Sequence, residues 1–379
     1  MARLQRYAGE HLGGQPHVVV LGSCKVGNFV VSTPVLQGLR NRFPKAVIGF
    51  IGSDVTADFE AAHPAIDWRL SWDRPGLQAA TDLVAGLAQA CSDHGPVALA
   101  VNLDGFNPVT TSLVPRLDPQ YVAGGSLSAN LRRRLPWGDQ AQQCFLADPD
   151  WDSPAFLERY AGVFRSNYIA ELFTQLAYVA KDVDPTAIQL PSVPPPFAVP
   201  DVLIHATTAR SAKVWPFVHW RSVIDHLSAQ GFSIGLVGSP PAAQREAYNA
   251  GEGEEWLLQT TALLDLRGQT SLIELAGASR LAKAVISVDA GPLHIAAAVG
   301  TPTLAVVGND ADDVGASPLR LWQPRCSNVS RTVSTISCTA CAERRFQNDD
   351  CVVEGHPCLD EGVQPEQVID WLNTTLTAG

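Results

Sequence analysis

Short apolar runs rich in β-branched residues alternate along this chain with longer segments of helical periodicity. In the first half, His17–Leu21, residues 46–51 and residues 97–103 are predicted to be strands because β-branched side chains dominate them. Helices are predicted near residues 78–90 and over residues 154–179. This alternation is typical of an α/β fold in which helices cover a parallel sheet.

The same alternation starts again after a proline-rich segment. Residues 189–200, QLPSVPPPFAVP, have the composition of a linker. The second half then predicts strands at Val202–His205, 233–237, Ala284–Val288 and 303–307, and helices at 218–230, 272–280 and from Pro292 to about Gly300. The repeated pattern predicts two doubly wound, Rossmann-like domains that face each other across a cleft lined by strand carboxyl ends.

These patterns divide the chain into four segments. Residues 1–190 form the expected N-terminal domain, residues 191–200 the linker and residues 201–325 the expected C-terminal domain. Residues 326–379 form a cysteine-rich loop followed by a C-terminal helix.

Composition narrows the class of protein. The 379 residues are 46% hydrophobic and 17% charged, which is typical of a globular protein with an ample core. The formal net charge of −11 argues against general nucleic-acid binding but leaves room for a local anion site. No apolar run is long enough for a membrane span, so peripheral membrane contact is the most we expect. The N-terminus has no signal-peptide pattern, so a cytoplasmic protein is expected, and a homo-oligomer is compatible with the sequence.

One turn in the second half carries candidate chemistry. In SVDAGPLHIAAAVGTPT, residues 287–303, a strand is followed by Asp289, Gly291, Pro292 and His294 before a helix begins. Free N–H groups at a helix N-terminus, with a histidine beside them, favour binding of an anion. The alternative is a tight turn in which the histidine is only a satisfied residue of the core.

The first strand of the chain is followed by a second glycine-bearing turn. The segment GSCKVGNF contains Gly22 and Gly27 but lacks the Gly-Lys-Ser/Thr of a Walker phosphate loop. An ATPase of that class is therefore excluded.

Three segments together resemble glycosyltransferase family 9, the ADP-heptose:lipopolysaccharide heptosyltransferases. They are GNFVVSTPVLQGLRNRFP near the N-terminus, HATTARSAKVWPFVHW at residues 205–220, and ISVDAGPLHIAAAVGTPT. The resemblance spans both halves of the chain in the family's order. It implies a GT-B fold, an acceptor-side N-terminal domain and a C-terminal domain that holds an ADP-sugar donor. It also implies inversion at the anomeric carbon without a catalytic metal, within lipopolysaccharide biosynthesis or a related pathway.

The resemblance assigns roles around the donor diphosphate. Lys213, after the Thr207–Thr208 turn, is expected to place a positive charge on the diphosphate, where developing negative charge must be stabilised; a surface lysine is the alternative. His294 is expected to donate to a phosphate oxygen, beside the N–H groups near Gly291.

Two carboxylates are candidates for sugar hydroxyls, since a carboxylate accepts two hydrogen bonds. Asp289 is expected to bind hydroxyls of the donor sugar, or to cap the helix that follows. Glu274 is expected to bind the ribose hydroxyls, or to be an exposed helical glutamate.

The general base departs from the family pattern. Many members carry an aspartate directly after the glycine of the first turn, and Asn28 follows Gly27 here; Gly27 is included among the expected donor contacts. Asparagine orients a hydroxyl but does not take its proton. Asp104, at the end of the strand over residues 97–103, is the expected substitute, and a turn-forming Asp-Gly pair is the alternative.

The cysteine-rich segment predicts a structural metal site. Five of the eight cysteines lie between positions 326 and 358, and clustering of this kind suits metal ligation in a reducing compartment. The expected ligands of one zinc or iron ion are Cys338, Cys341, Cys351 and Cys358. Two further candidate ligands are Cys326 and His356. Unligated thiols are the alternative.

The acceptor is left open between a saccharide, a protein and a small molecule. An anionic acceptor could be bound by three consecutive arginines, Arg132, Arg133 and Arg134. The alternative is that these arginines form a solvated face. Two other functions remain at this stage: a sugar-nucleotide epimerase of GT-B type, which needs no acceptor, and a catalytically weak binding or scaffold protein.

Overall fold

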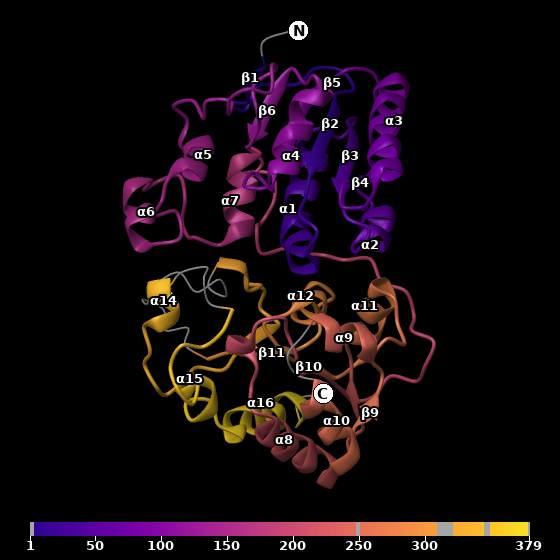
Figure 1. Cartoon of the computed structure of the whole chain (residues 1–379), viewed down its shortest axis with the longest axis vertical. Helices are drawn as coiled ribbons and strands as arrows, with labels where there is room; N and C mark the ends of the chain where they lie inside the picture. Colours follow the sequence, from indigo (N-terminus) through magenta and orange to yellow (C-terminus); the bar gives the residue numbers. More distant parts are fainter. Residues whose placement is uncertain (1–3, 248–250, 309–320, 345–348, 378–379) are drawn as a thin grey trace. The chain divides into compact units, whose positions relative to one another are not determined.

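The computed structural model describes residues 4–247, 251–308, 321–344 and 349–377. The chain divides into two compact units, Met1–Gln189 and Leu190–Gly379. Each unit is built around a six-stranded sheet in which all strand pairs are parallel (Figure 1).

The sheet of the first unit has the strand order β1-β6-β5-β2-β3-β4. Its strands are β1 (Gln5–Arg6), β2 (His17–Leu21), β3 (Val47–Gly52), β4 (Trp68–Ser71), β5 (Val97–Asn102) and β6 (Tyr121–Gly124). All five residues of the central strand β2 are buried, as expected for a parallel strand that is covered on both faces. Its side chains His-Val-Val-Val-Leu therefore form a continuous apolar run after the first residue.

The first four helices of the first unit alternate with its strands, and three more follow β6. They are α1 (Val26–Arg42), α2 (Ala57–Ala62), α3 (Leu77–His94), α4 (Pro108–Leu113), α5 (Ala141–Cys144), α6 (Pro154–Arg159) and α7 (Ile169–Leu176). Helix α1 packs against α7.

The single helix predicted over residues 154–179 is wrong, because α6 and α7 are separate. Gly162 adopts a φ of +86°, a left-handed conformation that glycine takes readily and that interrupts a helix. Glu171 in the first turn of α7 then accepts hydrogen bonds from the Arg165 N–H (2.6 Å) and the Ser166 hydroxyl (2.7 Å). These bonds fix the connection and begin a new helix.

The sheet of the second unit has the order β12-β11-β10-β7-β8-β9. Its strands are β7 (Val202–His205), β8 (Ile234–Leu236), β9 (Leu264–Asp265), β10 (Ala284–Val288), β11 (Thr303–Val306) and β12 (Val329–Arg331). The helices described are α8 (Phe217–Ala229), α9 (Pro241–Ala247), α10 (Gly251–Thr260), α11 (Leu272–Leu281), α12 (Gly291–Ala298), α14 (Ala340–Arg344), α15 (Pro357–Asp360) and α16 (Pro365–Thr377).

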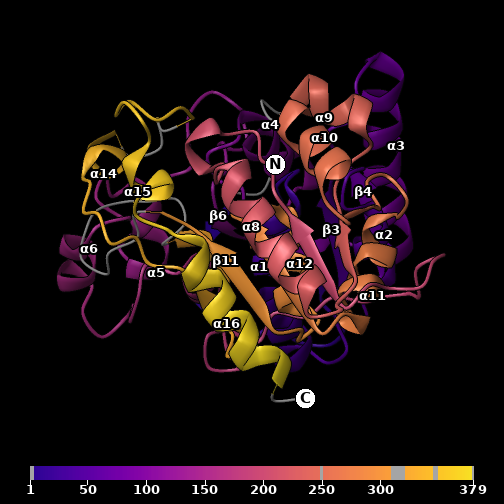
Figure 2. The same cartoon turned by 90° about the horizontal axis from the view of Figure 1, so that it is seen from below.

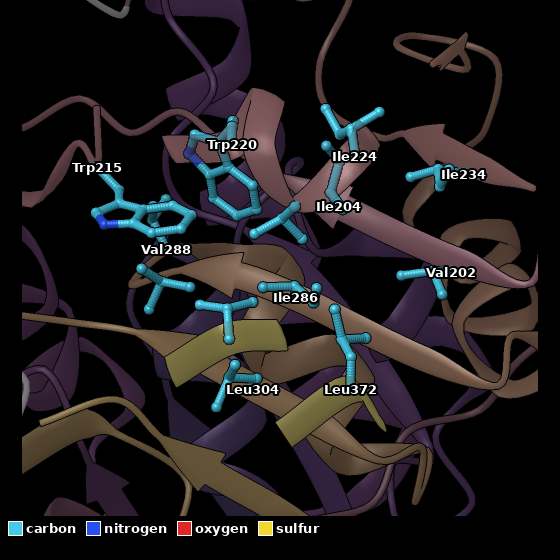
Figure 3. Close-up of a cluster of buried hydrophobic side chains, with 14 of the residues drawn as sticks. Val202, Ile204, Trp215, Trp220, Ile224, Ile234, Ile286, Val288, Leu304 and Leu372 are labelled. Carbon is cyan, nitrogen blue, oxygen red and sulfur yellow. The ribbon is translucent and has the colours of Figure 1, made fainter. Parts of the chain in front are cut away.

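The C-terminal helix α16 is part of the core of the second unit. It lies along α8 and packs against β10 and β11 (Figure 2). Its Leu372 is buried with Ile286 and Leu304 of the sheet, and with Trp215 and Trp220 (Figure 3). The two indole rings meet edge to face, with centroids 5.0 Å apart, a favourable aromatic arrangement.

Most of the predicted elements are confirmed, with ends shifted by a few residues. His17–Leu21, Val202–His205 and Ala284–Val288 are strands with the predicted bounds. Among the described residues, no helix has both the length and the apolar character that crossing a membrane requires.

Candidate functional site

The candidate site of the second unit lies where two neighbouring strands end. Strands β7 and β10 are paired in parallel, with Ser287 opposite His205. The carboxyl ends of parallel neighbours meet at the same edge of a sheet, where α/β proteins bind ligands. The turns that follow β7 and β10 are therefore brought together, although they are far apart in the sequence.

The turn after β10 leads directly into α12. The residue at the N-cap is Ala290, with an extended backbone and no side-chain cap, and Pro292 occupies the first turn of the helix, where its missing N–H is tolerated. Asp289 therefore does not cap α12, which was the alternative reading of this residue. Gly291 is the first residue of the helix.

Asp289 instead forms an ion pair with Lys213. The Lys213 ammonium donates to Asp289 Oδ2, and the side chains are 20% and 10% exposed, respectively. Burial would raise the pKa of Asp289, but Lys213, together with His294 and Arg210, outweighs burial and holds that pKa below its ordinary value. Lys213 is thus a half-buried cation at the strand edge, not a surface lysine.

His294 lies in the same charged surroundings. It is 5% exposed, and its Nδ1 is buried without a hydrogen-bond partner among the described residues. Burial lowers the pKa of His294 to about 4, with Asp289 opposing this shift and Lys213 adding to it. At neutral pH the ring is uncharged, so it can donate one hydrogen bond and accept another.

The two threonines predicted for this site follow β7 directly. Thr207 and Thr208 are both buried, and the short 3-10 turn Ser211–Lys213 comes next. The structure therefore places Thr207, Thr208, Lys213, Asp289, Gly291 and His294 at one edge of one sheet. Their binding of a ligand stays a prediction.

Glu274 has a structural partner that the sequence prediction missed. Its carboxylate accepts hydrogen bonds from the Ser271 N–H and hydroxyl, both at 2.8 Å, and completes a capping box at the start of α11. These Ser271 hydrogen bonds lower the pKa of Glu274. A ribose-binding role for Glu274 stays a prediction, and its observed partner belongs to its own helix.

The first unit holds the turn that contains Gly27 and Asn28. Both residues lie in the first turn of α1, which begins at Val26. The Asn28 amide donates a hydrogen bond to the Ser23 hydroxyl at 2.9 Å. An amide in this position has no basic oxygen with which to take a proton at neutral pH.

Asp104 lies just beyond the end of the neighbouring strand. Strands β2 and β5 pair with Leu21 opposite Asn102, so the turn after β2 and Asp104 lie at the same sheet edge. The Asp104 carboxylate accepts a hydrogen bond from the Asn107 amide at 2.9 Å. Burial raises the pKa of Asp104, and Asn107 and then Lys25 oppose that shift. Its backbone carbonyl also accepts from the Asn107 N–H at 2.9 Å, so the turn-forming role is present too.

The four cysteines predicted to bind a metal are not gathered into a site. Cys358 is buried and Cys338 packs against the core of the second unit, while Cys351 donates a hydrogen bond to the Val353 carbonyl. Across the described ranges, no group of three or more His, Cys, Asp or Glu side chains is arranged to hold a metal ion. The described side chains therefore show no metal site, and metal binding by these cysteines stays a prediction from their spacing. All eight cysteines are free of disulfides.

A buried ion-pair network around Arg267 was missed by the sequence prediction. Arg267, whose side chain is 2% exposed, binds Glu254 at 3.0 Å, and the Glu254 side chain is 0% exposed. Arg267 also binds Glu255 and Asp265 at 2.9 and 2.8 Å. No spacing pattern marks these residues in the sequence, because they come from α10, from the end of β9 and from the segment after β9.

Comparisons with known proteins agree with this architecture. The chain is 36% identical over 107 residues to lipopolysaccharide heptosyltransferase 1 of Escherichia coli K12, a match covering 28% of this chain and 31% of that protein. It is 24% identical over 384 residues to lipopolysaccharide heptosyltransferase 2 of the same strain, covering 95% and 98% of the two chains. The match to heptosyltransferase 1 thus spans about a third of that relative's length.

Solved structures show the same fold. A glycosyltransferase family 9 protein of Veillonella parvula matches with a TM-score of 0.70 and 17% identity, over 96% of this chain and 98% of that one. The E. coli heptosyltransferase WaaC with ADP matches with a TM-score of 0.62 and 17% identity, over 95% and 99%. The predicted GT-B fold class is confirmed by these neighbours and by the two parallel sheets.

The family assignment rests on a match that covers just over half of the chain. The model of glycosyltransferase family 9 (heptosyltransferase) matches residues 146–349. This range includes the Lys213 turn and the Asp289 turn, which the structure brings to one sheet edge. The chain therefore belongs to glycosyltransferase family 9.

Proposed function

We propose that this protein is an inverting glycosyltransferase that moves a heptose or a related sugar from an ADP-sugar donor to an acceptor hydroxyl. The observation that carries the proposal is the half-buried Lys213–Asp289 pair beside the uncharged ring of His294. A site for a sugar diphosphate needs a cation and hydrogen-bond donors for the phosphates, and an acceptor for sugar hydroxyls. Those groups share one edge of the second sheet.

Lys213 is the residue that stabilises negative charge on the leaving group. As the bond to the anomeric carbon breaks, negative charge grows on the diphosphate, and a fixed cation in a half-buried place stabilises it more than water would. Asp289 holds the ammonium group in place before the donor arrives. The relative crystallised with ADP supports an adenine nucleotide as the leaving group.

Asp104 is the residue that takes the acceptor proton in this proposal. The side-chain amide of Asn28 donates a hydrogen bond to the Ser23 hydroxyl, and it lacks a basic oxygen. Asp104, by contrast, is a half-buried carboxylate at the carboxyl end of β5 in the first sheet. A pKa raised by burial makes this carboxylate a stronger base than an exposed aspartate. The Asn107 amide, at 2.9 Å, orients it.

Only the chemical class of the acceptor is proposed. It is a saccharide, a protein or a small molecule that offers a hydroxyl, within lipopolysaccharide biosynthesis or a related pathway in the cytoplasm. The relatives named as lipopolysaccharide heptosyltransferases support the saccharide. Arg132, Arg133 and Arg134 are exposed and available to an anionic group.

The test is a transfer assay with mass-spectrometric detection. The full chain is incubated with ADP-heptose and cell extract, and both the released nucleoside diphosphate and a glycosylated product are measured. Formation of ADP together with a product that is heavier by one heptose supports the proposal. Conversion of the donor in the absence of any acceptor indicates an epimerase instead, and no donor turnover indicates a binding protein.

The predicted structural ion is a separate hypothesis. Support for zinc or iron on Cys338, Cys341, Cys351 and Cys358 comes from the spacing of the thiols, and no reaction step depends on it. Elemental analysis of protein purified without an affinity metal tests it. About one equivalent is expected, and a metal-free, fully active preparation would contradict it.

A further inference from the structure

The turn that carries Lys213 is not anchored by the core. Residues 209–214 are all exposed or half-buried, whereas Thr208 before them and Trp215 after them are buried. The 3-10 turn Ser211–Lys213 has no buried residue. Something other than core packing must therefore fix the position of Lys213 between these two anchors.

The cysteine-bearing segment supplies that support. The Ala212 N–H donates to the Asp349 carbonyl at 3.2 Å, and the Ser211 hydroxyl donates to Asp350 Oδ1 at 2.5 Å. Arg210 forms an ion pair with Asp349 at 3.1 Å. Three consecutive residues of the turn, all directly before Lys213, thus contact two consecutive residues of the segment.

A further contact ties the other side of Lys213 to the same segment. On the far side of Lys213, the buried Trp215 indole donates to the Val363 carbonyl at 2.8 Å. Residues before and after Lys213 are therefore tied to the same stretch of chain, which begins beside Cys351 and runs past Cys358.

We propose that residues 349–363 are a brace that holds the Lys213 turn in the geometry needed to bind the donor diphosphate, with Asp349 and Asp350 as positioning residues. The inference rests on the proposed function, because it concerns the same donor site. It gives the cysteine-rich segment a role that needs no bound metal. A preorganised cation binds its anion more tightly because less freedom is lost on binding.

The experiment measures ADP binding by calorimetry with the full chain. The test variant is the double substitution Asp349→Ala/Asp350→Ala, and the control is Glu354→Ala, an exposed acid in the same segment. We expect the double variant to bind ADP about three- to tenfold more weakly, since it loses one exposed ion pair and one hydrogen bond. We expect Glu354→Ala to match wild type.

A double-mutant cycle with Lys213→Ala separates positioning from general damage. If the brace acts through Lys213, its removal changes ADP affinity little once Lys213 is gone. Unchanged affinity of the double variant, or an equal loss in the Lys213→Ala background, would overturn the inference. Ser211→Ala, which removes the hydrogen bond from the other side, serves if the double variant does not fold. Failure of wild type to bind ADP at all would count against the proposed function, and it would also overturn the inference that residues 349–363 are a brace.

Discussion

Lys213 and Asp289 lie 76 positions apart in the sequence and form a half-buried ion pair. They meet because β7 and β10 are parallel neighbours, and each residue follows the end of its strand. The pair joins two segments that both lie within the range matched by the family model, residues 146–349.

His294 is expected to make the second unit lose stability on acidification. Its pKa is lowered to about 4 by burial, against about 6.5 in an unfolded chain. Between these two values the unfolded state takes up the proton and the folded state does not, so stability falls as the pH falls from 6.5 to 4. For this shift the loss is at most about 3 kcal/mol.

The measurement is urea unfolding at several pH values in this window. His294→Gln should flatten the pH dependence, whereas replacement of the exposed His11 by Gln should leave it unchanged. An identical slope in wild type and His294→Gln would show that other groups account for the acid sensitivity.

Asp104→Asn is expected to reduce turnover about 10²- to 10⁴-fold, the usual range for removal of a general base. ADP affinity should stay near the wild-type value, because the donor contacts are on other residues. Since burial raises the pKa of Asp104, the wild-type rate should begin to fall at a higher pH than an ordinary aspartate would give.

The control is Asp93→Asn, which replaces an exposed carboxylate of α3. Asn28→Asp should be tolerated, and it should recover part of the rate when combined with Asp104→Asn. Wild-type turnover by Asp104→Asn would assign the proton transfer to another group.

Arg267→Met is expected to destabilise the second unit by about 3–5 kcal/mol, because it leaves the Glu254 carboxylate buried without its cation. Arg221→Met removes an exposed pair with Asp225 and should cost at most about 1 kcal/mol. Chemical denaturation of both variants checks the difference. Similar losses in the two variants would mean that the buried pair contributes no more than a surface pair.

Much of the fold could be predicted from the sequence because parallel strands buried on both faces are continuous apolar runs. The runs at His17–Leu21 and Ala284–Val288 are such strands. The break between α6 and α7 was missed because the apolar pattern continues across Gly162, whose left-handed backbone depends on the surrounding structure.

The candidate site was predictable only in part. The resemblance indicated Lys213 and Asp289, but nothing in the sequence indicated that they pair with each other. The capping box is visible in the sequence as Ser271 three positions before Glu274, and it favours a structural role for Glu274 over the predicted ligand role. The contacts of Asp349 and Asp350 with the Lys213 turn could not be predicted, because they join distant segments through an irregular region.

The most direct test of the donor site is ADP binding by Lys213→Ala, measured by titration calorimetry beside Lys283→Ala. Lys283 is a matched control, since it is 58% exposed and pairs with Asp201. Loss of a charged contact to a desolvated phosphate should weaken ADP binding by about 2–3 kcal/mol in Lys213→Ala, while Lys283→Ala should bind ADP as wild type does. Equal ADP affinities for wild type and Lys213→Ala would contradict the assignment of the donor site.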